Sequence, residues 1–317
     1  MLSESLFKTG RLCVVGNINR DVKTAPLRAG EQLLKDGETP VPWIAETIGG
    51  GGANSAFTAA ALGAKVAFVG KVGTDALGDK LEAALRRHGI AAHLARDPER
   101  ATGTSLALTF DDGHRHFVSC QPNNEAIAFE DLDLTALADH DHLFRADIWF
   151  SKAMLFGGNE RLFRAARDAG LTVSIDLNWD PQWGVASAAE VRARKEAVRG
   201  ALRWVNLAHG NVRELSEFAD ATELPTSLER LAQWGVEAVV VHLGPLGAGY
   251  YERGHLLIEP AVAAARHVNS TGTGDVLSVC MMLLHQHPDT AAKLRLANTV
   301  VAEFIEGKRA FIPRLAD

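Results

Sequence analysis

NSTGTGD at residues 269–275 is followed directly by the apolar run VLSV at residues 276–279. Glycines let backbone N–H groups turn toward one point, and a helix that begins there adds unpaired N–H groups and the positive end of its dipole. Such a corner suits an anion, with Asp275 placed to deprotonate a hydroxyl beside it. The same residues also fit a glycine-rich turn in which Asp275 is an ordinary helix cap. Both interpretations stay open on this stretch alone.

The composition is that of a globular protein. Of 317 residues, 47% are hydrophobic and 23% are charged, which is long and apolar enough for one large α/β domain with a small appendage. The formal net charge of −6 argues against nucleic acid as the main partner, because phosphate binding needs a basic face.

The cysteines and the N-terminus bear on the compartment. Cys13, Cys120 and Cys280 are far apart, odd in number and set in apolar runs, so we interpret them as buried thiols of a reducing compartment. The first apolar run, residues 12–15, is too short for a signal peptide or a membrane span. We expect a soluble cytoplasmic protein without a membrane partner.

Helices and short apolar strands alternate along most of the chain. Apolar runs predict buried strands at residues 11–16, 66–70, 147–151, 171–176, 204–208 and 238–243. Amphipathic or apolar segments predict helices at residues 75–88, 160–169, 188–202, 212–218, 228–234, 276–287 and 290–306. This alternation predicts a mostly parallel sheet that is covered by helices on both faces.

Two groups of segments do not follow the alternation. Residues 22–47 contain three prolines and predict short extended segments rather than a helix. They are expected to pair with residues 104–110 and 116–119, which flank a turn at 111–113, in a small separate sheet. Residues 250–252 and 256–258 predict a hairpin at the end of the main sheet.

A run of four glycines at residues 49–52 precedes Ala53, Asn54 and a predicted helix at 55–62. Each glycine costs conformational entropy, so the run indicates a close approach of the backbone to a ligand, a hinge or a flexible linker. The spacing fits neither a dinucleotide-binding fingerprint nor a Walker A loop. Zinc-ligand spacings and a G-x-S-x-G motif are absent from the sequence as well.

Polar residues gather where the predicted strands end, which is where α/β sheets bind ligands. Asn19 and Asp21 follow the first strand, and their spacing of two points them the same way in extended chain. Residues 176–180, 211–214 and 244–247 follow later strands. Asn211 and Glu214 suit a hydrated Mg²⁺, but the same spacing fits an N-cap with a capping-box glutamate.

Together these motifs resemble the ribokinase-like (PfkB) family of carbohydrate kinases over nearly the full length and in the same order. Residues 16–21 resemble the sugar-contact segment of that family, and residues 49–54 with 70–78 resemble its first signature. Asn211 and Glu214 resemble its N-x-x-E element, and residues 269–275 resemble its second signature, D-T-x-G-A-G-D.

The resemblance implies ATP-dependent phosphorylation of a sugar hydroxyl by a single domain over residues 1–317. The implied fold is a three-layer α/β/α domain with a mostly parallel sheet and a β-sheet lid, formed by about residues 22–48 and 103–119. The lid is implied to form a homodimer surface. ATP and Mg²⁺ are the implied cofactors.

Site roles follow from the same resemblance. Asp275 is implied to be the catalytic base, with an anion hole formed by the N–H groups of Gly272, Thr273 and Gly274. The residues implied to hold the sugar are Asn19, Asp21, Gly50, Gly51, Asn54 and Asp275. Those implied at the nucleotide are Asn211, Gly244, Gly247, Thr271, Gly272, Gly274 and Asn298. Asn211 and Glu214 are implied to act on Mg²⁺ through water.

The sequence departs from the family pattern at three places. Asn269-Ser270 stands where the family usually has Asp-Thr, and in many members that aspartate helps to bind an activating monovalent cation, so K⁺ activation is left open. Gly51 stands where ribokinases carry lysine, and residues 151–155 lack the acidic residue expected for ribose. Residues 176–183 resemble the D-x-N-x-R stretch of fructokinases and sugar-acid kinases, but the arginine is replaced by Asp180 or shifted away, which weakens the implied contact with a sugar-acid carboxylate.

These departures favour a neutral hexose or ketose as the substrate. The alternatives are a sugar-acid or nucleoside kinase of the same family, or a non-catalytic sugar- or nucleotide-binding regulator on the same fold.

Overall fold

The computed structural model describes residues 3–112, 114–268 and 271–315. Within them, one large sheet has nine strands in the order β13-β12-β11-β10-β9-β8-β1-β4-β5. Neighbours from β11 to β5 run parallel, whereas β12 and β13 are antiparallel. The strands are β1 Arg11–Val15, β4 Lys65–Gly73, β5 Ala91–Asp97, β8 His142–Arg145, β9 Thr172–Asp176, β10 Leu207–Asn211, β11 Ala238–His242, β12 Ala248–Glu252 and β13 His255–Glu259.

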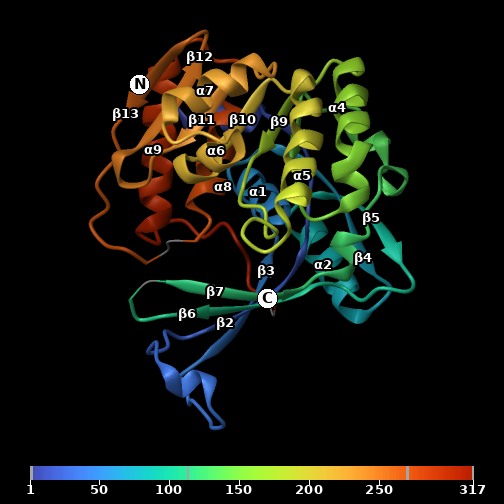
Figure 1. The fold of residues 1–317 in the computed structure, drawn as a ribbon, viewed down its shortest axis with the longest axis vertical. Helices are drawn as coiled ribbons and strands as arrows, with labels where there is room; N and C mark the ends of the chain where they lie inside the picture. Colours follow the sequence, from blue (N-terminus) through green and yellow to red (C-terminus); the bar gives the residue numbers. More distant parts are fainter. Residues whose placement is uncertain (1–2, 113, 269–270, 316–317) are drawn as a thin grey trace.

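Helices cover both faces of this sheet, as Figure 1 shows. The α-helices are α1 Gly51–Ala61, α2 Ala76–Arg87, α3 Pro122–Glu125, α4 Asn159–Asp168, α5 Ala188–Ala201, α6 Val212–Ala219, α7 Leu224–Gln233, α8 Thr273–Leu283 and α9 Thr290–Ile305. Shorter 3₁₀ turns are η1 Glu4–Thr9, η2 Glu31–Leu34, η3 Phe129–Asp131, η4 Leu134–Leu137, η6 Leu202–Trp204 and η7 Gly244–Leu246, and η5 Met154–Gly158 is a π-helical turn before α4.

The alternation of side chains along β1 shows how the two layers are held. Leu12 and Val14 are buried in the core under α1, α2, α8 and α9. Cys13 and Val15 are buried in the second core, under α4 to α7. A strand that is apolar on both sides is what a parallel sheet between two helical layers requires.

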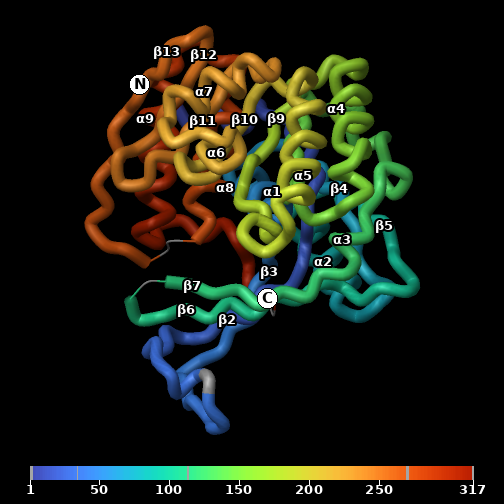
Figure 2. The backbone as a smooth tube through the Cα atoms, viewed as in Figure 1, coloured from blue at the N-terminus to red at the C-terminus, as the bar shows by residue number. Residues whose placement is uncertain are grey.

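A smaller four-stranded sheet has the order β3-β2-β6-β7. We call it the lid after the role that the resemblance implies for these segments. Its strands are β2 Asn19–Thr24, β3 Ile44–Gly49, β6 Thr104–Thr109 and β7 Arg115–Cys120. The predicted pairing between these two chain segments is confirmed, because β2 pairs with β6 in parallel. The lid lies below the helices and the main sheet in Figure 1, and the segment between β2 and β3 projects away from the body in Figure 2.

Several predicted boundaries are wrong. The strand predicted at 147–151 is a loop, and the strand of that region is β8 His142–Arg145. The edge strand β5 was not expected at all. Strand β10 lies three residues later than the predicted 204–208. Helix α1 begins at Gly51, so two of the four glycines are helical. Helix α8 begins at Thr273 rather than 276 and ends at Leu283.

The cysteines and the helix lengths also bear on the expectations from composition. Cys13 and Cys280 are buried as predicted, but Cys120 is exposed at the end of β7, so the prediction of three buried thiols is wrong. Within the described ranges, no helix combines the length and the apolar character that crossing a membrane requires.

Candidate active site

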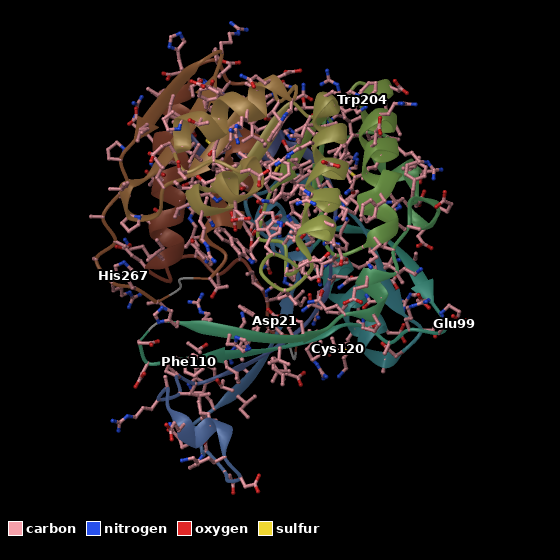
Figure 3. The ribbon with its side chains drawn as sticks, viewed as in Figure 1. Asp21, Glu99, Phe110, Cys120, Trp204 and His267 are labelled. Atoms are coloured by element: carbon pink, nitrogen blue, oxygen red, sulfur yellow. The ribbon has the colours of Figure 1, made fainter. Side chains whose placement is uncertain are left out.

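A cavity of about 900 Å³ lies between the lid and the carboxyl ends of the main strands. The lid contributes Asn19, Asp21, Ser105, Phe117 and Ser119 to its wall. The main body contributes loops that follow β1, β8 and β9, together with Thr271 before α8. Asp21 lies on the side of the lid that faces the body (Figure 3). The predicted convergence of strand-end clusters therefore holds for these segments.

Asp275 lies in the first turn of α8. Gly272 is the N-cap residue, and its φ of 85° is a left-handed conformation that favours glycine. The N–H groups of a first helical turn have no partner within the helix, so this end of α8 presents donors and a positive dipole. Asn54 of α1 donates a hydrogen bond from Nδ2 to Asp275 Oδ2 over 3.2 Å. Helix α8 thus starts beside the cavity, with its carboxylate held by α1.

Burial raises the pKa of Asp275 to about 7, from an ordinary value of 3.8. The hydrogen bond from Asn54 lowers this pKa, and the charges of Asp147 and Glu214 raise it. A carboxylate that titrates near neutral pH is well matched to accepting a proton from a hydroxyl.

Asp147 is a site residue that the sequence interpretation missed. It follows β8 in a left-handed conformation, with a φ of 55° that is unusual for a residue other than glycine. Its carboxylate accepts from the backbone N–H groups of Asn17 at 2.9 Å, Gly52 at 2.9 Å and Gly51 at 3.2 Å. Asp147 thereby joins the end of β1 to the first turn of α1 and lines the cavity.

The glycine run brings these backbones together. A Cβ at Gly52 would lie 2.7 Å from Gly16 Cα, and one at Gly50 would lie 2.3 Å from Asn17 O. Gly50 also has a φ of 97° and lines the cavity. A Cβ at Gly51 would lie 2.8 Å from Asp147 Oδ1. The glycine run therefore packs closely against other parts of the chain. The predicted close approach to a ligand stays a prediction.

Amide oxygens near the cavity lack partners. Asn19 and Asp21 lie on one face of β2, as predicted, and Asn19 Nδ2 donates to Asp21 Oδ1 over 2.7 Å. Asn19 Oδ1 and Asn54 Oδ1 are buried and accept no hydrogen bond in the described structure. Buried polar atoms are usually satisfied, so these two indicate that a ligand with hydroxyl donors completes the site.

Asn211 and Glu214 form a capping box at the start of α6. Asn211 Oδ1 accepts from Glu214 N over 2.9 Å, and Glu214 Oε2 accepts from Asn211 N over 2.8 Å. The capping alternative is thus confirmed. Burial raises the pKa of Glu214, and burial together with the charge of Glu214 raises the pKa of Asp176 well above its usual range.

This acidic region fits a hydrated cation better than a direct metal cage. The negative charge of Glu214 contributes to the raised pKa of Asp176, so a cation nearby would offset this repulsion. The described residues contain no cluster of three carboxylate, histidine or cysteine ligands. Since Mg²⁺ keeps several of its waters in proteins, the residues present fit Mg²⁺ held through water.

The predicted nucleotide residues lie around the β11–β12 turn and α9. Gly244 and Gly247 flank η7 with φ values of 57° and 108°. Asn298 on α9 donates from Nδ2 to the carbonyls of Glu259 and Pro260. A second cavity, of about 730 Å³, lies between residues 259–262 and α9.

A protein-family model described as pfkB family carbohydrate kinase matches residues 9–306. The chain belongs to this family. It is therefore an ATP-dependent phosphotransferase that acts on a sugar, and the resemblance inferred from the motifs is confirmed.

Curated relatives of this kinase are similar at low identity. A ribokinase of Arabidopsis thaliana is 27% identical over 96% of this chain and 78% of that protein. A fructokinase of Vibrio alginolyticus is 27% identical over 81% of this chain and 82% of that protein. The bifunctional protein HldE of Bradyrhizobium is 35% identical over 55% of this chain, which spans only 37% of that longer protein.

Solved structures confirm the fold of the kinase. A fructokinase with bound ATP from Xylella fastidiosa superposes with a TM-score of 0.77 at 21% identity, covering 95% of this chain and 92% of that one. A structure from E. coli in complex with ATP and Mg²⁺ superposes with a TM-score of 0.80 at 18% identity, covering 95% and 94%.

Asn269 and Ser270, where the kinase departs from the family signature, lie outside the described residues. The K⁺ question raised by that departure therefore stays a prediction.

Proposed function

We propose that this kinase transfers the γ-phosphoryl group of ATP to a hydroxyl of a neutral sugar, a hexose or ketose, with Asp275 as the base. The observation that carries the proposal is the position of Asp275. It lies at the N-terminus of α8, has a pKa raised to about 7, and is held by Asn54 at the edge of the lid-covered cavity.

Phosphoryl transfer depends on positioning and charge stabilisation more than on covalent chemistry. Asp275 orients the acceptor hydroxyl and takes its proton as the new P–O bond forms. The N–H groups of Gly272, Thr273 and Gly274 and the dipole of α8 stabilise the negative charge of the transferring group. The helix supplies this stabilisation without any reorganisation at the moment of transfer.

The sugar occupies the 900 Å³ cavity in this proposal. Asp21, Asn19 and Asn54 offer oxygen acceptors to its hydroxyl groups, and Asp275 receives the hydroxyl that is phosphorylated. Gly50 and Gly51 hold the backbone of the α1 turn close to the sugar. Trp149 and Trp179 also line the cavity and supply flat apolar surfaces for the carbon face of a sugar ring.

The nucleotide lies on the other side of the α8 N-terminus. We assign its phosphates to Thr271, Gly272, Gly274 and the Asn211 region, and its base to the area of Gly244, Gly247 and Asn298. The 730 Å³ cavity supports this assignment, because Glu259 and Pro260 line it and their carbonyls accept hydrogen bonds from Asn298. Asn211 and Glu214 hold Mg²⁺ through water, and the metal neutralises phosphate charge when bound.

The lid closes over the sugar and keeps out water, which would otherwise compete as acceptor. Its outer face exposes Ile44, Leu106 and Val118, at 64%, 45% and 53%. This face is our candidate for the homodimer surface. Sedimentation of the full chain tests the dimer, and a monomer at micromolar concentration contradicts it.

A panel of hexoses, ketoses, sugar acids and nucleosides, assayed for ADP formation with Mg·ATP, tests the function. We expect turnover with at least one neutral sugar and little with acids or nucleosides. Ligand-induced thermal stabilisation without ADP formation would support a non-catalytic regulator instead.

A further inference from the structure

Arg194 is a buried arginine in the wall of the sugar cavity. It lies on α5, is 3% exposed and lines the cavity together with Glu190, one helical turn earlier. It was not expected as a site residue, because α5 is rich in arginines that suit a solvated helix face.

Most of the guanidinium is already satisfied. Nε and Nη2 donate to the two oxygens of Asp180 over 2.7 and 2.9 Å, and Nη2 also donates to Trp149 O over 2.6 Å. Asp180 is fully buried, so this is a bidentate ion pair inside the protein.

The remaining nitrogen, Nη1, is free. Among the described residues no group accepts a hydrogen bond from it, and it is not among the buried atoms that lack a partner. Because the residue lines the cavity while almost all of it is covered, Nη1 is open to the cavity. Nη1 is therefore a hydrogen-bond donor, held in position by the other bonds of the guanidinium, that a ligand in the cavity can use.

The charge of this donor is cancelled by its partner. The carboxylate of Asp180 neutralises the guanidinium of Arg194. Among the described residues that line the cavity, the other cation is Lys152, which is 76% exposed and 3.8 Å from Glu190. A carboxylate in the cavity would therefore meet no uncompensated cation.

We propose that the Asp180–Arg194 pair determines specificity: Nη1 of Arg194 binds an uncharged oxygen of the sugar, and Asp180 disfavours sugar acids by neutralising the guanidinium. This inference rests on the proposed sugar-kinase function and names the device by which the site selects a neutral substrate.

Matched pairs of sugars test the proposal: D-fructose with 2-keto-D-gluconate, D-glucose with D-gluconate, and D-ribose with D-ribonate. Each pair is compared by kcat/KM with Mg·ATP and by calorimetric binding without ATP. The variant Asp180→Asn leaves the charge of Arg194 uncompensated. We expect it to raise the acid-to-neutral ratio about tenfold or more, since a charge-assisted bond to a carboxylate becomes available.

The control is Glu217→Gln on α6. It removes a carboxylate that accepts over 2.9 Å from Nζ of Lys195, the neighbour of Arg194 on α5, and neither Glu217 nor Lys195 lines the cavity. It should leave the ratio unchanged. An unchanged ratio in Asp180→Asn overturns the proposal while wild-type turnover of a neutral sugar sustains the proposed function. If Asp180→Asn changes the binding ratio but the wild type turns over no sugar, the specificity proposal holds and the proposed kinase function is contradicted.

A second variant covers the case in which Asp180→Asn does not fold. Asp180→Leu combined with Arg194→Met replaces the buried pair with apolar side chains, which proteins often tolerate. We expect it to fold and to raise KM for the neutral sugar about tenfold, because one hydrogen bond from a charged donor is lost. A wild-type KM in this variant shows that the pair is only structural.

Discussion

Asn54 Nδ2 lies 3.2 Å from Asp275 Oδ2, although the two residues are 221 positions apart in the chain. This bond joins the first turns of α1 and α8. It therefore connects the glycine run at residues 49–52, which borders the sugar cavity, to the carboxylate that we propose as the base. Asn54 Oδ1 is left free. The amide nitrogen of Asn54 therefore holds Asp275, and its amide oxygen can accept a hydrogen bond from the substrate.

The pH dependence of activity should follow Asp275. Its pKa is raised to about 7, and only the ionised form accepts a proton. We expect kcat/KM for the sugar to fall about tenfold per pH unit below about pH 7 and to level off above it. A profile that stays flat down to pH 5, measured with saturating Mg·ATP, would exclude this carboxylate as the base.

Stability should change with pH in the opposite sense. The pKa of Asp275 is higher in the folded than in the unfolded state, so the folded protein binds the extra proton and loses stability as pH rises from about 4 to about 7. Asp275→Asn removes the buried charge. We expect its free energy of unfolding at pH 8 to exceed that of wild type by roughly 2 kcal/mol, with little difference at pH 4. Urea unfolding at both pH values measures this, and a variant less stable at pH 8 contradicts it.

Two glycines of the proposed nucleotide loop should respond differently to alanine. A Cβ at Gly247 would lie 2.2 Å from Glu259 O, whereas one at Gly244 meets nothing within 4 Å. Both have positive φ, so Gly244→Ala should cost about 1 kcal/mol from the backbone alone. Gly247→Ala should cost at least about 3 kcal/mol more or prevent folding. Equal melting temperatures would show that the turn relaxes freely.

The capping box at α6 separates a structural role from a metal role. Asn211→Ala removes the N-cap and should cost about 1 kcal/mol of stability. Glu214→Gln keeps an oxygen for Asn211 N but removes the charge. We expect this variant to keep its stability and to need about tenfold more Mg²⁺ for half-maximal activity. If Glu214→Gln needs the same Mg²⁺ concentration as the wild type for half-maximal activity, Glu214 only caps α6 and does not bind the metal.

The alternation of apolar runs and amphipathic segments was enough to predict the layers and the lid pairing, but not every strand. Ile148 and Trp149 make an apolar run and are buried in the core under α4 to α7, yet they lie in a loop. Strand β8 was missed because it carries the polar residues His142 and Arg145, which are buried in the fold with Ser174 and Asn159 as hydrogen-bond partners. Strand β5 lies at the edge and is half-exposed, so it has no continuous apolar run.

The site residues also divide into those that the sequence predicted and those that it did not. Asp275, Asn54, Asn19 and Asp21 stand in motifs with local spacing, and the structure brings Asn54 and Asp275 into contact and sets Asn19 and Asp21 on one wall of the cavity. Asp147 and Arg194 carry no local signal. Asp147 accepts from the backbone N–H groups of Asn17, after β1, and of Gly52 in α1. Arg194 donates to Asp180. Such roles arise from tertiary contacts and are visible only in the fold.

The central claim is that Asp275 is the base for phosphoryl transfer to a sugar and not merely a helix cap. Asp75 offers a matched control, since it caps α2 by accepting from Gly78 N over 2.8 Å and does not line the cavity. Rapid-quench assays of Asp275→Asn and Asp75→Asn with Mg·ATP and the sugar found in the panel compare the two.

We predict that Asp275→Asn slows transfer about a thousandfold with its fold intact by circular dichroism, whereas Asp75→Asn loses stability and keeps its transfer rate. Transfer at the wild-type rate in Asp275→Asn would contradict the account.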